Sequence, residues 1–495
     1  MTTTAPALPN VERTGVKFTP DSQRVLLRPF IPAVEARITK IIARVMTLSD
    51  AETAERLHAV MEEFGGRHTG TENFLESNYA RVARFSLTDR VPDRTRRLLI
   101  GSFFTSEYAL ECAALFNPSI VPHPSQLGLA PGAMRLVMSL RATGEGHISS
   151  IEFREGVLNA DNSLAMEPTN RFVTAPDLVA DASYEKELFR RKLDEMGFRD
   201  GITDAVLNAL PDPFTLPLLQ KIITAHHRGS KGRQQTHEES RGLDNLVWLA
   251  KSNYEVAFHQ SVPLSERIIF PVSDNESNGI EDARFVQFTD EDGDMRYYAT
   301  YTAYNGRVIL PQILETRDFE RFKISTLNGR AVQNKGMALF PRKIDGRYAM
   351  ISRQDNENIF IMYSDNINFW EEAVPLLKPT YPWEFVQLGN CGSPLETEAG
   401  WLLLTHGVGA MRKYCIGAVL LDKEDPGKVI GRLAEPILSP NQNEREGYVP
   451  NVVYTCGALI HNGRLVMPYA MSDSASSVAI IPLDELLAGL LASKP

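Results

Sequence analysis

The chain has 495 residues, of which 43% are hydrophobic and 23% are charged, an ordinary balance for a globular protein with more than one packing unit. Its 62 acidic residues outnumber its 52 basic ones, so the formal net charge is −10 at pH 7. This balance argues against binding duplex nucleic acid along a basic face, but it leaves room for a local pocket that binds a small anion.

The first part of the chain has a helical pattern. Apolar residues recur at helical spacing between Pro32 and Gly66, with Ser49 and Asp50 typical of the start of a second helix. Residues 93–116 also read as helical. We therefore predict an N-terminal helical region over residues 1–110, which builds an oligomer or shapes the substrate site.

From about residue 117 the pattern changes to short runs of β-branched and aromatic residues. Three turn dipeptides between such runs predict tight hairpins: Asp292–Gly293, Asp345–Gly346 and Asn462–Gly463. A weak repeat places Phe322 and Trp370 in similar segments 48 residues apart, a period typical of propeller blades. The repeat alone leaves a β-sandwich open as the alternative.

A second helical stretch interrupts this β region. Residues 184–228 read as helical, with breaks at Pro211 and Pro213, and residues 229–242 read as a polar loop. We predict a helical insertion at about residues 170–250, inside a catalytic domain that spans residues 111–490.

Several common functional motifs are absent. The sequence has no GxxxxGK[ST] loop and no GxGxxG after a strand, and HEESR at His237–Arg241 lacks the second histidine of HExxH. The four cysteines show no zinc-ligand spacing, and their scatter favours a reducing compartment. With no signal peptide and no apolar run of ~18–20 residues, the sequence predicts a cytoplasmic protein without a metal or cofactor.

Polar residues gather instead at the ends of predicted strands. The segment NGIEDARF places Asp282 beside Glu281 and Arg284, although charged residues are poor strand formers. Further polar residues in comparable places are Lys335, Arg353, Gln387, Asn390, His406, Tyr448, Asn451 and Asp473. Each alone is explained as a solvated strand end, but together they predict a polar funnel at one end of a propeller.

Five motifs in this order resemble glycoside hydrolase family 130, the inverting β-mannoside phosphorylases and related β-mannosidases. They are NGIEDAR, the NK…LFPRKI…GRY…SR run, GxxGxP, GWL with HGV, and a final PYxxxD. The resemblance covers about residues 116–487 apart from the insertion. It implies a mainly β fold, a five-bladed β-propeller, here with an N-terminal α-helical extension and a helical insertion in the first blade.

The resemblance also implies roles for single residues. Asp282 is the expected general acid, which acts through the mannose 3-hydroxyl, and Ala283 stands where many members have proline. The expected phosphate-binding residues are Lys335, Arg353, Gln387 and His406, of which Gln387 replaces a lysine. The expected substrate-binding residues are Asn117, Arg141, Arg284, Tyr304, Tyr448, Asn451 and Asp473. Phosphate is the co-substrate, and because it is already an anionic nucleophile, no catalytic base is needed.

The alternation of a regular strand makes a prediction about this motif. Ile280, Asp282 and Arg284 would share one face and Glu281 the other, so we expect Asp282 to enter the funnel and Glu281 to cap structure behind it. Since a close guanidinium lowers the pKa of a carboxyl, we expect Arg284 to bind another group, such as Glu281 or a sugar hydroxyl.

The sequence thus predicts a glycosyltransferase-type enzyme that cleaves a β-mannoside with phosphate to give α-mannose 1-phosphate. The favoured substrate is β-1,2-mannobiose or β-1,2-oligomannan, with β-1,4-mannosyl-glucose and mannosyl-N-acetylglucosamine still open. The expected partners are the mannoside, phosphate and further copies of the chain, with no nucleic acid or membrane. A β-mannosidase with Glu396, Glu444 or Glu446 as base is the alternative, and a non-catalytic sugar-binding protein is a third reading that Asp282 disfavours.

Overall fold

The structure is a computed structural model, which describes residues 8–179, 182–229, 237–307 and 309–493. This part of the chain is mainly β, as predicted, and its largest sheets are five antiparallel ones of four to six strands. Among the described residues, no helix combines the length and the apolar character that crossing a membrane requires.

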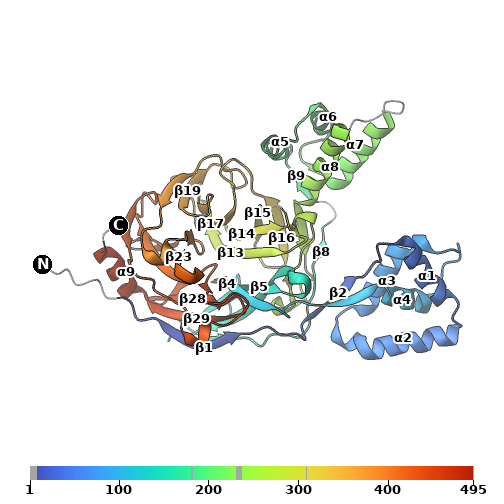
Figure 1. The fold of residues 1–495 in the computed structure, drawn as a ribbon, viewed down its shortest axis with the longest axis horizontal. Helices are drawn as coiled ribbons and strands as arrows, with labels where there is room; N and C mark the ends of the chain where they lie inside the picture. Colours follow the sequence, from blue (N-terminus) through green and yellow to red (C-terminus); the bar gives the residue numbers. More distant parts are fainter. Residues whose placement is uncertain (1–7, 180–181, 230–236, 308, 494–495) are drawn as a thin grey trace.

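The N-terminal region joins two parts of the molecule. Strand β1 (Glu12–Phe18) pairs with β29 (Ala475–Pro482) in the last sheet. A two-stranded ribbon of β2 (Val25–Pro29) and β3 (Thr105–Ala109) then leads to four helices that lie apart from the sheets (Figure 1). The helices are α1 (Glu35–Met46), α2 (Asp50–Phe64), α3 (Thr71–Val82) and α4 (Arg94–Ser102).

The predicted helix start at Ser49 is confirmed, because its side chain and that of Glu52 form a reciprocal capping box. The prediction that residues 93–116 are helical is wrong beyond Ser102. The chain there enters β3 and then the first sheet, where pairing with a neighbouring strand overrides local helical pattern.

Five sheets form the body of the molecule. The first contains β4 (Ala114–Pro122), β5 (Met134–Thr143), β6 (Ser149–Leu158), β7 (Leu164–Met166) and β12 (Ile268–Ile269). The second contains β8 (Asp177–Leu178), β11 (Tyr254–Ala257), β13 (Ile280–Thr289), β14 (Met295–Tyr304), β15 (Ile309–Thr316) and β16 (Arg321–Thr326). The third contains β17 (Lys335–Leu339), β18 (Tyr348–Arg353), β19 (Ile359–Ser364) and β20 (Val374–Leu377). The fourth contains β21 (Gln387–Asn390), β22 (Leu395–Thr397), β23 (Gly400–Val408), β24 (Tyr414–Leu421) and β25 (Val429–Arg432). The fifth contains β1, β26 (Val453–Tyr454), β27 (Leu459–His461), β28 (Arg464–Met471) and β29, and helix α9 (Leu483–Ala492) follows it.

These sheets follow one another around a centre (Figure 1). Strand β4 packs beside β13, β14 beside β17, β18 beside β21, and β24 beside β26, and β28 packs beside β4 again. Each sheet therefore touches the next, and the fifth touches the first. The strands that end the sheets on the inner side are β4, β13, β17, β21 and β26.

Three of the inner strands share an irregularity in their pairing. The register shifts between Phe116 and Ser119 in β4, between Glu281 and Arg284 in β13, and between Lys335 and Ala338 in β17. The first of the two residues inside each bulge has a left-handed backbone: Asn117 at φ 48°, Asp282 at φ 55° and Gly336 at φ 86°. Because a bulge adds a residue and re-aims the side chains around it, these are equivalent positions in three neighbouring sheets.

The hairpin predictions are confirmed. Asp292–Gly293 joins β13 to β14, Asp345–Gly346 joins β17 to β18, and Asn462–Gly463 joins β27 to β28. In the last two, both residues have positive φ, as a tight two-residue hairpin turn requires. The weak repeat also has a structural counterpart, since Phe322 lies in β16 and Trp370 just before β20, the fourth strands of neighbouring sheets.

The helical insertion consists of α5 (Lys186–Glu195), α6 (Gly201–Ala209), α7 (Leu216–Gly229) and α8 (His237–Lys251), with a short pair of β9 (Ser183–Tyr184) and β10 (Phe214–Thr215). It interrupts the first sheet, because β12 follows it and pairs with β6. Of the predicted loop, residues 230–236 lie outside the described residues, and the prediction is wrong from His237, where α8 begins.

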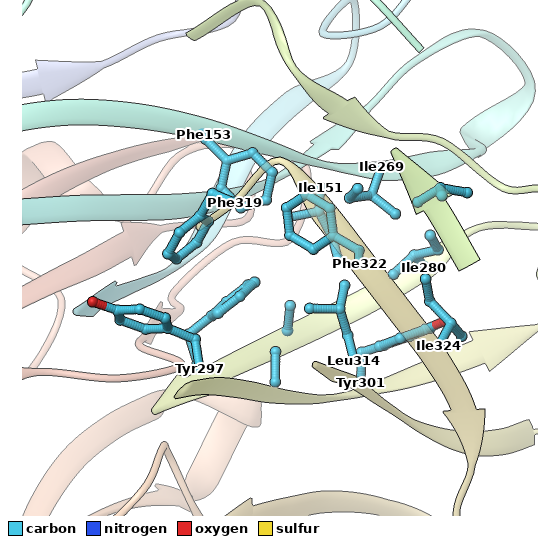
Figure 2. Packing of buried hydrophobic residues seen from close by; sticks show 14 of the residues in the cluster. Ile151, Phe153, Ile269, Ile280, Tyr297, Tyr301, Leu314, Phe319, Phe322 and Ile324 are labelled. Atoms are coloured by element: carbon cyan, nitrogen blue, oxygen red, sulfur yellow. The ribbon is translucent and has the colours of Figure 1, made fainter. Parts of the chain in front are cut away.

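A large apolar cluster lies between the first and second sheets and fixes the start of β13. Phe153 stacks on Phe322, with ring centroids 5.9 Å apart, and meets the edge of Phe319 at 5.5 Å (Figure 2). Ile280 is fully buried in the same cluster. Since Glu281 and Asp282 follow it directly, the core holds the backbone from which both carboxylates project.

Candidate active site

The side chain of Asp282 lies at the centre of a polar cluster at the starts of the inner strands. Asn117 donates from Nδ2 to Asp282 Oδ1 at 2.6 Å, and Arg141 donates from a guanidinium nitrogen to the same oxygen at 3.2 Å. Asn117 comes from β4 and Arg141 from the end of β5, where it faces Phe116. The bulges at Asn117 and Asp282 therefore bring residues of the first two sheets into contact.

Glu281 lies in the same cluster, and the prediction that it points to the opposite side is wrong. Its Oε1 accepts a hydrogen bond from Arg141 at 3.0 Å, and its Oε2 accepts one from Lys335 Nζ at 2.5 Å. The alternation expected of a regular strand fails because the bulge between Glu281 and Arg284 turns both consecutive carboxylates toward Arg141. Glu281 is thus a site residue that the strand argument placed on the wrong face.

Arg284 connects three of the inner strands beside the cluster. Its guanidinium donates to the carbonyl of Cys391 at 2.7 Å, to the hydroxyl of Tyr454 at 2.6 Å, and to the backbone carbonyl of Asp282 at 3.0 Å. The side chain is buried, and the expected contact with Glu281 is not made. Arg284 instead ties β13 to β21 and β26.

Burial alone would raise the pKa of the Asp282 carboxyl. The surrounding positive charges, first that of Arg141 and then those of Arg284 and Lys335, outweigh burial and lower this pKa to about 2. A general acid works best with a pKa nearer the working pH, which the ligand-free site does not give to Asp282.

Asp473 is a second carboxyl near Asp282, in the turn between β28 and β29. Burial raises its pKa, the negative charge of Asp282 raises it further, and the result is about 6 despite the opposing charges of Arg141 and Arg412. The site thus holds two carboxyls whose pKa values are driven apart, a pattern typical of active sites.

Arg353 and His406 form a further buried pair in the cluster. A guanidinium nitrogen of Arg353 lies 3.0 Å from His406 Nε2, and both side chains are buried. Because a guanidinium only donates, Nε2 must accept, which requires an imidazole unprotonated at that nitrogen. Burial, followed by the charges of Arg353 and Arg284, lowers the pKa of His406 well below its usual value, so the ring is neutral.

Arg353 has an unusual environment for a buried charge. Among the residues that the structure describes, no carboxylate lies within ion-pair distance of its guanidinium. Burial lowers the pKa of Arg353, which shows how poorly the protein alone compensates this charge. A buried charge without a counter-ion is costly, so the surroundings of this guanidinium are chemically suited to an anion.

The four predicted phosphate-binding residues come from adjacent strands. Lys335 starts β17 directly opposite Arg353 at the end of β18. Gln387 starts β21 and shares a strand face with Gly389, where an added Cβ would lie 2.4 Å from His406 Cε1 and 3.1 Å from Arg353 Cδ. Gln387 therefore lies one step nearer the strand start than the Arg353–His406 pair.

The remaining predicted residues have other hydrogen-bond partners or positions than the residues around Asp282. Tyr448 is exposed, and its hydroxyl lies 3.2 Å from His147 Nδ1 in the loop between β5 and β6. Asn451 accepts a hydrogen bond from Arg445 at 2.7 Å, and Tyr304 is the half-buried last residue of β14. These three residues do not contact the carboxylate cluster in the hydrogen bonds that the described residues make.

No three histidine, cysteine, aspartate or glutamate side chains of the described residues are grouped as metal ligands would be.

Comparison with known proteins matches residues 247–491 to the glycoside hydrolase family 130 model, described as beta-1,4-mannooligosaccharide phosphorylase. The chain is also 37% identical over 232 residues to a 1,2-beta-oligomannan phosphorylase of Thermoanaerobacter sp. (strain X514), covering 44% of this chain and 75% of the relative. The chain belongs to glycoside hydrolase family 130.

Two further similarities fall in the same region. A beta-1,2-mannobiose phosphorylase of the same Thermoanaerobacter strain is 36% identical over 43% of this chain and 69% of its own length. Among solved structures, a beta-1,2-mannobiose phosphorylase from Listeria innocua in complex with beta-1,2-mannobiose covers 77% of this chain and 93% of its own, at 21% identity and a TM-score of 0.46.

The family 130 match has a clear lower boundary. It begins within α8, so it includes Asp282, Lys335, Arg353 and Asp473 but not Asn117 or Arg141. Strands β4 and β5 of the first sheet lie outside the matched residues. Their Asn117 and Arg141 are assigned to the site because they form hydrogen bonds with Asp282.

Proposed function

We propose that this protein is an inverting β-mannoside phosphorylase, which transfers a mannosyl group to phosphate and releases α-mannose 1-phosphate. Family membership and the phosphorylase names of the relatives support this reaction. Two of those names specify β-1,2 linkages, which supports β-1,2-mannobiose or β-1,2-oligomannan as the substrate.

Arg353 is the observation that carries the proposal. An enzyme whose nucleophile is water needs no unpaired buried guanidinium, whereas one that binds phosphate needs a cation or strong donors at that place. The cluster as a whole also carries more positive than negative charge. Its cations are Arg141, Arg284, Lys335 and Arg353, and its carboxylates are Glu281, Asp282 and Asp473. With His406 neutral, this excess of positive charge suits a phosphate anion without any charge at Gln387.

The residues then have the following roles. Phosphate, held by Lys335, Arg353, Gln387 and His406, attacks the anomeric carbon from the face opposite the leaving sugar. The bond from that carbon to the leaving oxygen breaks, and the leaving oxygen receives the proton of Asp282, directly or through the mannose 3-hydroxyl. Attack from the opposite face inverts the configuration, so a β-mannoside gives an α-phosphate.

Asp282 must be protonated to act as the acid, although its pKa in the ligand-free site is about 2. Bound phosphate resolves this difficulty. Its negative charge lies beside Lys335, one of the cations that lower this pKa, so phosphate raises the pKa of Asp282 toward the range in which a general acid is effective.

The mannose-binding role of Asn117, Arg141 and Asp473 is supported by their position around Asp282. Arg284 acts as a brace beneath that pocket. Tyr304 is proposed to line the mannose pocket as well, and Tyr448 and Asn451 are proposed to contact the substrate.

We further propose that the five sheets are the blades of a five-bladed β-propeller. The succession of sheet contacts around a centre supports this arrangement. The corresponding division is a helical region over residues 1–110, whose strand β1 nevertheless belongs to the fifth sheet, and a catalytic domain over 111–490 that carries the insertion at about 170–250. Assembly into a homo-oligomer and a cytoplasmic location stay predictions.

A mannosidase of the same fold would need a catalytic base, and two of the three candidates are held elsewhere. Glu444 binds Arg13 and accepts from the Tyr469 hydroxyl at 2.7 Å. Glu396 is paired with Arg342. It lies in β22 opposite Trp401 at the start of β23, whereas Gln387 lies opposite Val408 at the end of β23. Neither carboxylate is free to activate a water molecule at the site.

The decisive experiment incubates the purified protein with β-1,2-mannobiose, with and without inorganic phosphate. We expect mannose 1-phosphate only when phosphate is present, and we expect Asp282→Asn to form it about 10²–10⁴-fold more slowly. Equal release of free mannose in both reactions would refute phosphorolysis and support the hydrolase. Absence of any product from wild-type protein would refute the β-1,2 linkage and move the same pair of reactions to β-1,4-mannosides.

A further inference from the structure

Asn390 is a buried polar residue that the reaction described above does not use. It is the last residue of β21 and is 0% exposed. Neither its amide oxygen nor its amide nitrogen has a hydrogen-bond partner among the described residues. Protein interiors leave few such groups unpaired, because each loses its bonds to water on burial. The amide therefore calls for a partner that is not part of the chain.

A small space lies beside this amide, at Gly336, where an added Cβ would fit in ordinary van der Waals contact. A Cβ added there would be 3.4 Å from Asn390 Oδ1, 3.4 Å from Arg353 Cβ and 4.0 Å from Arg353 Nε. Arg353 Nε is also buried and also lacks a partner among the described residues. The space is thus bordered by two unsatisfied polar groups, which come from different strands.

The equivalent positions in the neighbouring sheets show where a side chain at Gly336 would point. Asn117 and Asp282 occupy the same place in their bulges, and their side chains meet in the centre of the site at 2.6 Å. Gly336, with φ 86°, has the same left-handed backbone but no side chain. The third equivalent position is therefore left empty on the side of Arg353.

We propose that Asn390 is a further phosphate-binding residue, and that the glycine at 336 leaves the space that one phosphate oxygen fills. This inference rests on the proposed phosphorolysis. Arg353 donates from Nε to that oxygen. Asn390 donates from Nδ2 after its side-chain amide flips by about 180°, and no existing hydrogen bond among the described residues opposes this flip because neither amide atom has a partner there. A water molecule would satisfy the amide but would leave the charge of Arg353 uncompensated.

The test compares phosphate binding with mannoside binding in Asn390→Ala and in the nearly isosteric Asn390→Asp. Loss of one hydrogen bond to a charged group raises the phosphate KM by about 10-fold or more in Asn390→Ala, with the mannoside KM nearly unchanged. Asn390→Asp raises the phosphate KM further, because its carboxylate pairs with Arg353 and repels phosphate. Gly336→Ala raises it as well, by filling the space.

A binding measurement without turnover accompanies the kinetics. We expect inorganic phosphate to raise the melting temperature of wild-type protein more than that of Asn390→Ala. Without phosphate, Asn390→Ala melts no lower than wild type, because the substitution removes an unsatisfied amide. Ser352→Ala is the matched control, since Ser352 is buried and unpartnered in the same way but lies on the other face of β18 from Arg353. It leaves both phosphate effects unchanged.

The outcomes separate this inference from the function on which it rests. If wild-type protein forms no mannose 1-phosphate and gains no stability from phosphate, the proposed function fails and this inference fails with it. If wild type does both while Asn390→Ala keeps the wild-type phosphate KM and thermal gain, only the inference is overturned. The same holds if Asn390→Ala melts lower than wild type by equal amounts with and without phosphate, which would show a purely structural side chain. Should Asn390→Ala not fold, Asn390→Asp provides the same comparison.

Discussion

We predict that phosphate binding raises the pKa of Asp282 and protonates its carboxyl. The charges of the site allow the size of this shift to be worked out. In the ligand-free site the pKa of Asp282 is about 2, because nearby cations outweigh burial. At pH 7 only about one molecule in 10⁵ then has this carboxyl protonated. Such a group is nearly useless as a general acid, so its pKa must rise when the reactants bind.

A phosphate dianion is sufficient for this rise. Two negative charges about 5 Å from the carboxyl, at an effective dielectric constant of about 20, disfavour its ionised form by about 6–7 kcal/mol. This energy corresponds to about 5 units of pKa, which would bring Asp282 from about 2 to about 7. A monoanion would supply about half of that change.

Isothermal titration calorimetry measures the effect without turnover. Phosphate is titrated at about pH 6 in two buffers with different enthalpies of ionisation, and the difference in heat gives the protons taken up on binding. We expect wild-type protein to take up about one proton more than Asp282→Asn, in which no carboxyl can be protonated at that position. Asp473→Asn is the matched control, because it removes the neighbouring carboxyl and keeps Asp282.

The comparison has a clear contrary result. If wild type and Asp282→Asn both bind phosphate with the same proton count, phosphate does not protonate Asp282, and the reasoning is wrong. If instead Asp473→Asn is the only variant that takes up one proton fewer than wild type, the proton binds to Asp473. The pKa of Asp473, about 6, already makes it the more easily protonated of the two carboxyls.

Four further outcomes are expected. Asp282→Asn slows cleavage of β-1,2-mannobiose by about 10²–10⁴-fold but retains activity on an aryl mannoside with an acidic leaving group; equal loss on both would argue against an acid role. Glu281→Gln weakens its hydrogen bonds to Arg141 and Lys335 and raises the phosphate KM by about 10-fold, as steady-state kinetics will show; an unchanged phosphate KM would mean that Lys335 needs no anchor. Asp473→Asn raises the melting temperature above about pH 6, because the folded-state pKa of about 6 makes wild type lose up to about 3 kcal/mol of stability as pH rises from 4 to 6; a gain that persists unchanged at pH 4 contradicts this. Gln387→Lys lowers the phosphate KM by about 10-fold, and no change would place Gln387 outside the phosphate site.

The sequence predicts the β class and the hairpins because their signals are local. Asp345–Gly346 and Asn462–Gly463 specify tight turns through backbone conformations that few other residue pairs adopt. Residues 103–116 were mistaken for helix, because their apolar spacing is compatible with either structure and only pairing with distant strands decides between them. The pairing of β1 with β29 has no local signal at all, since its partners are more than 450 residues apart.

The candidate site shows the same division. The residue types around Asp282 follow from the motifs, but the position of Glu281 does not, because a regular strand would bury it behind the site. The bulge reverses that expectation, and it depends on a left-handed backbone at Asp282 that the sequence offers no reason to assign to an aspartate in a strand. The equivalence of Asn117, Asp282 and Gly336 was hidden for the same reason, since the three residues share a backbone conformation and no side-chain type.

The charges of the site also bear on the choice between phosphate and water. Lys335, which is proposed to hold phosphate, also helps Arg141 and Arg284 to keep Asp282 ionised while phosphate is absent. A mannoside that binds alone therefore meets a site with no protonated acid at Asp282, and water gains no help in breaking the glycosidic bond. Once phosphate enters, it supplies the nucleophile and at the same time restores the proton on Asp282. The charge of Lys335 would thus help both to bind the co-substrate and to suppress hydrolysis, without any residue dedicated to excluding water.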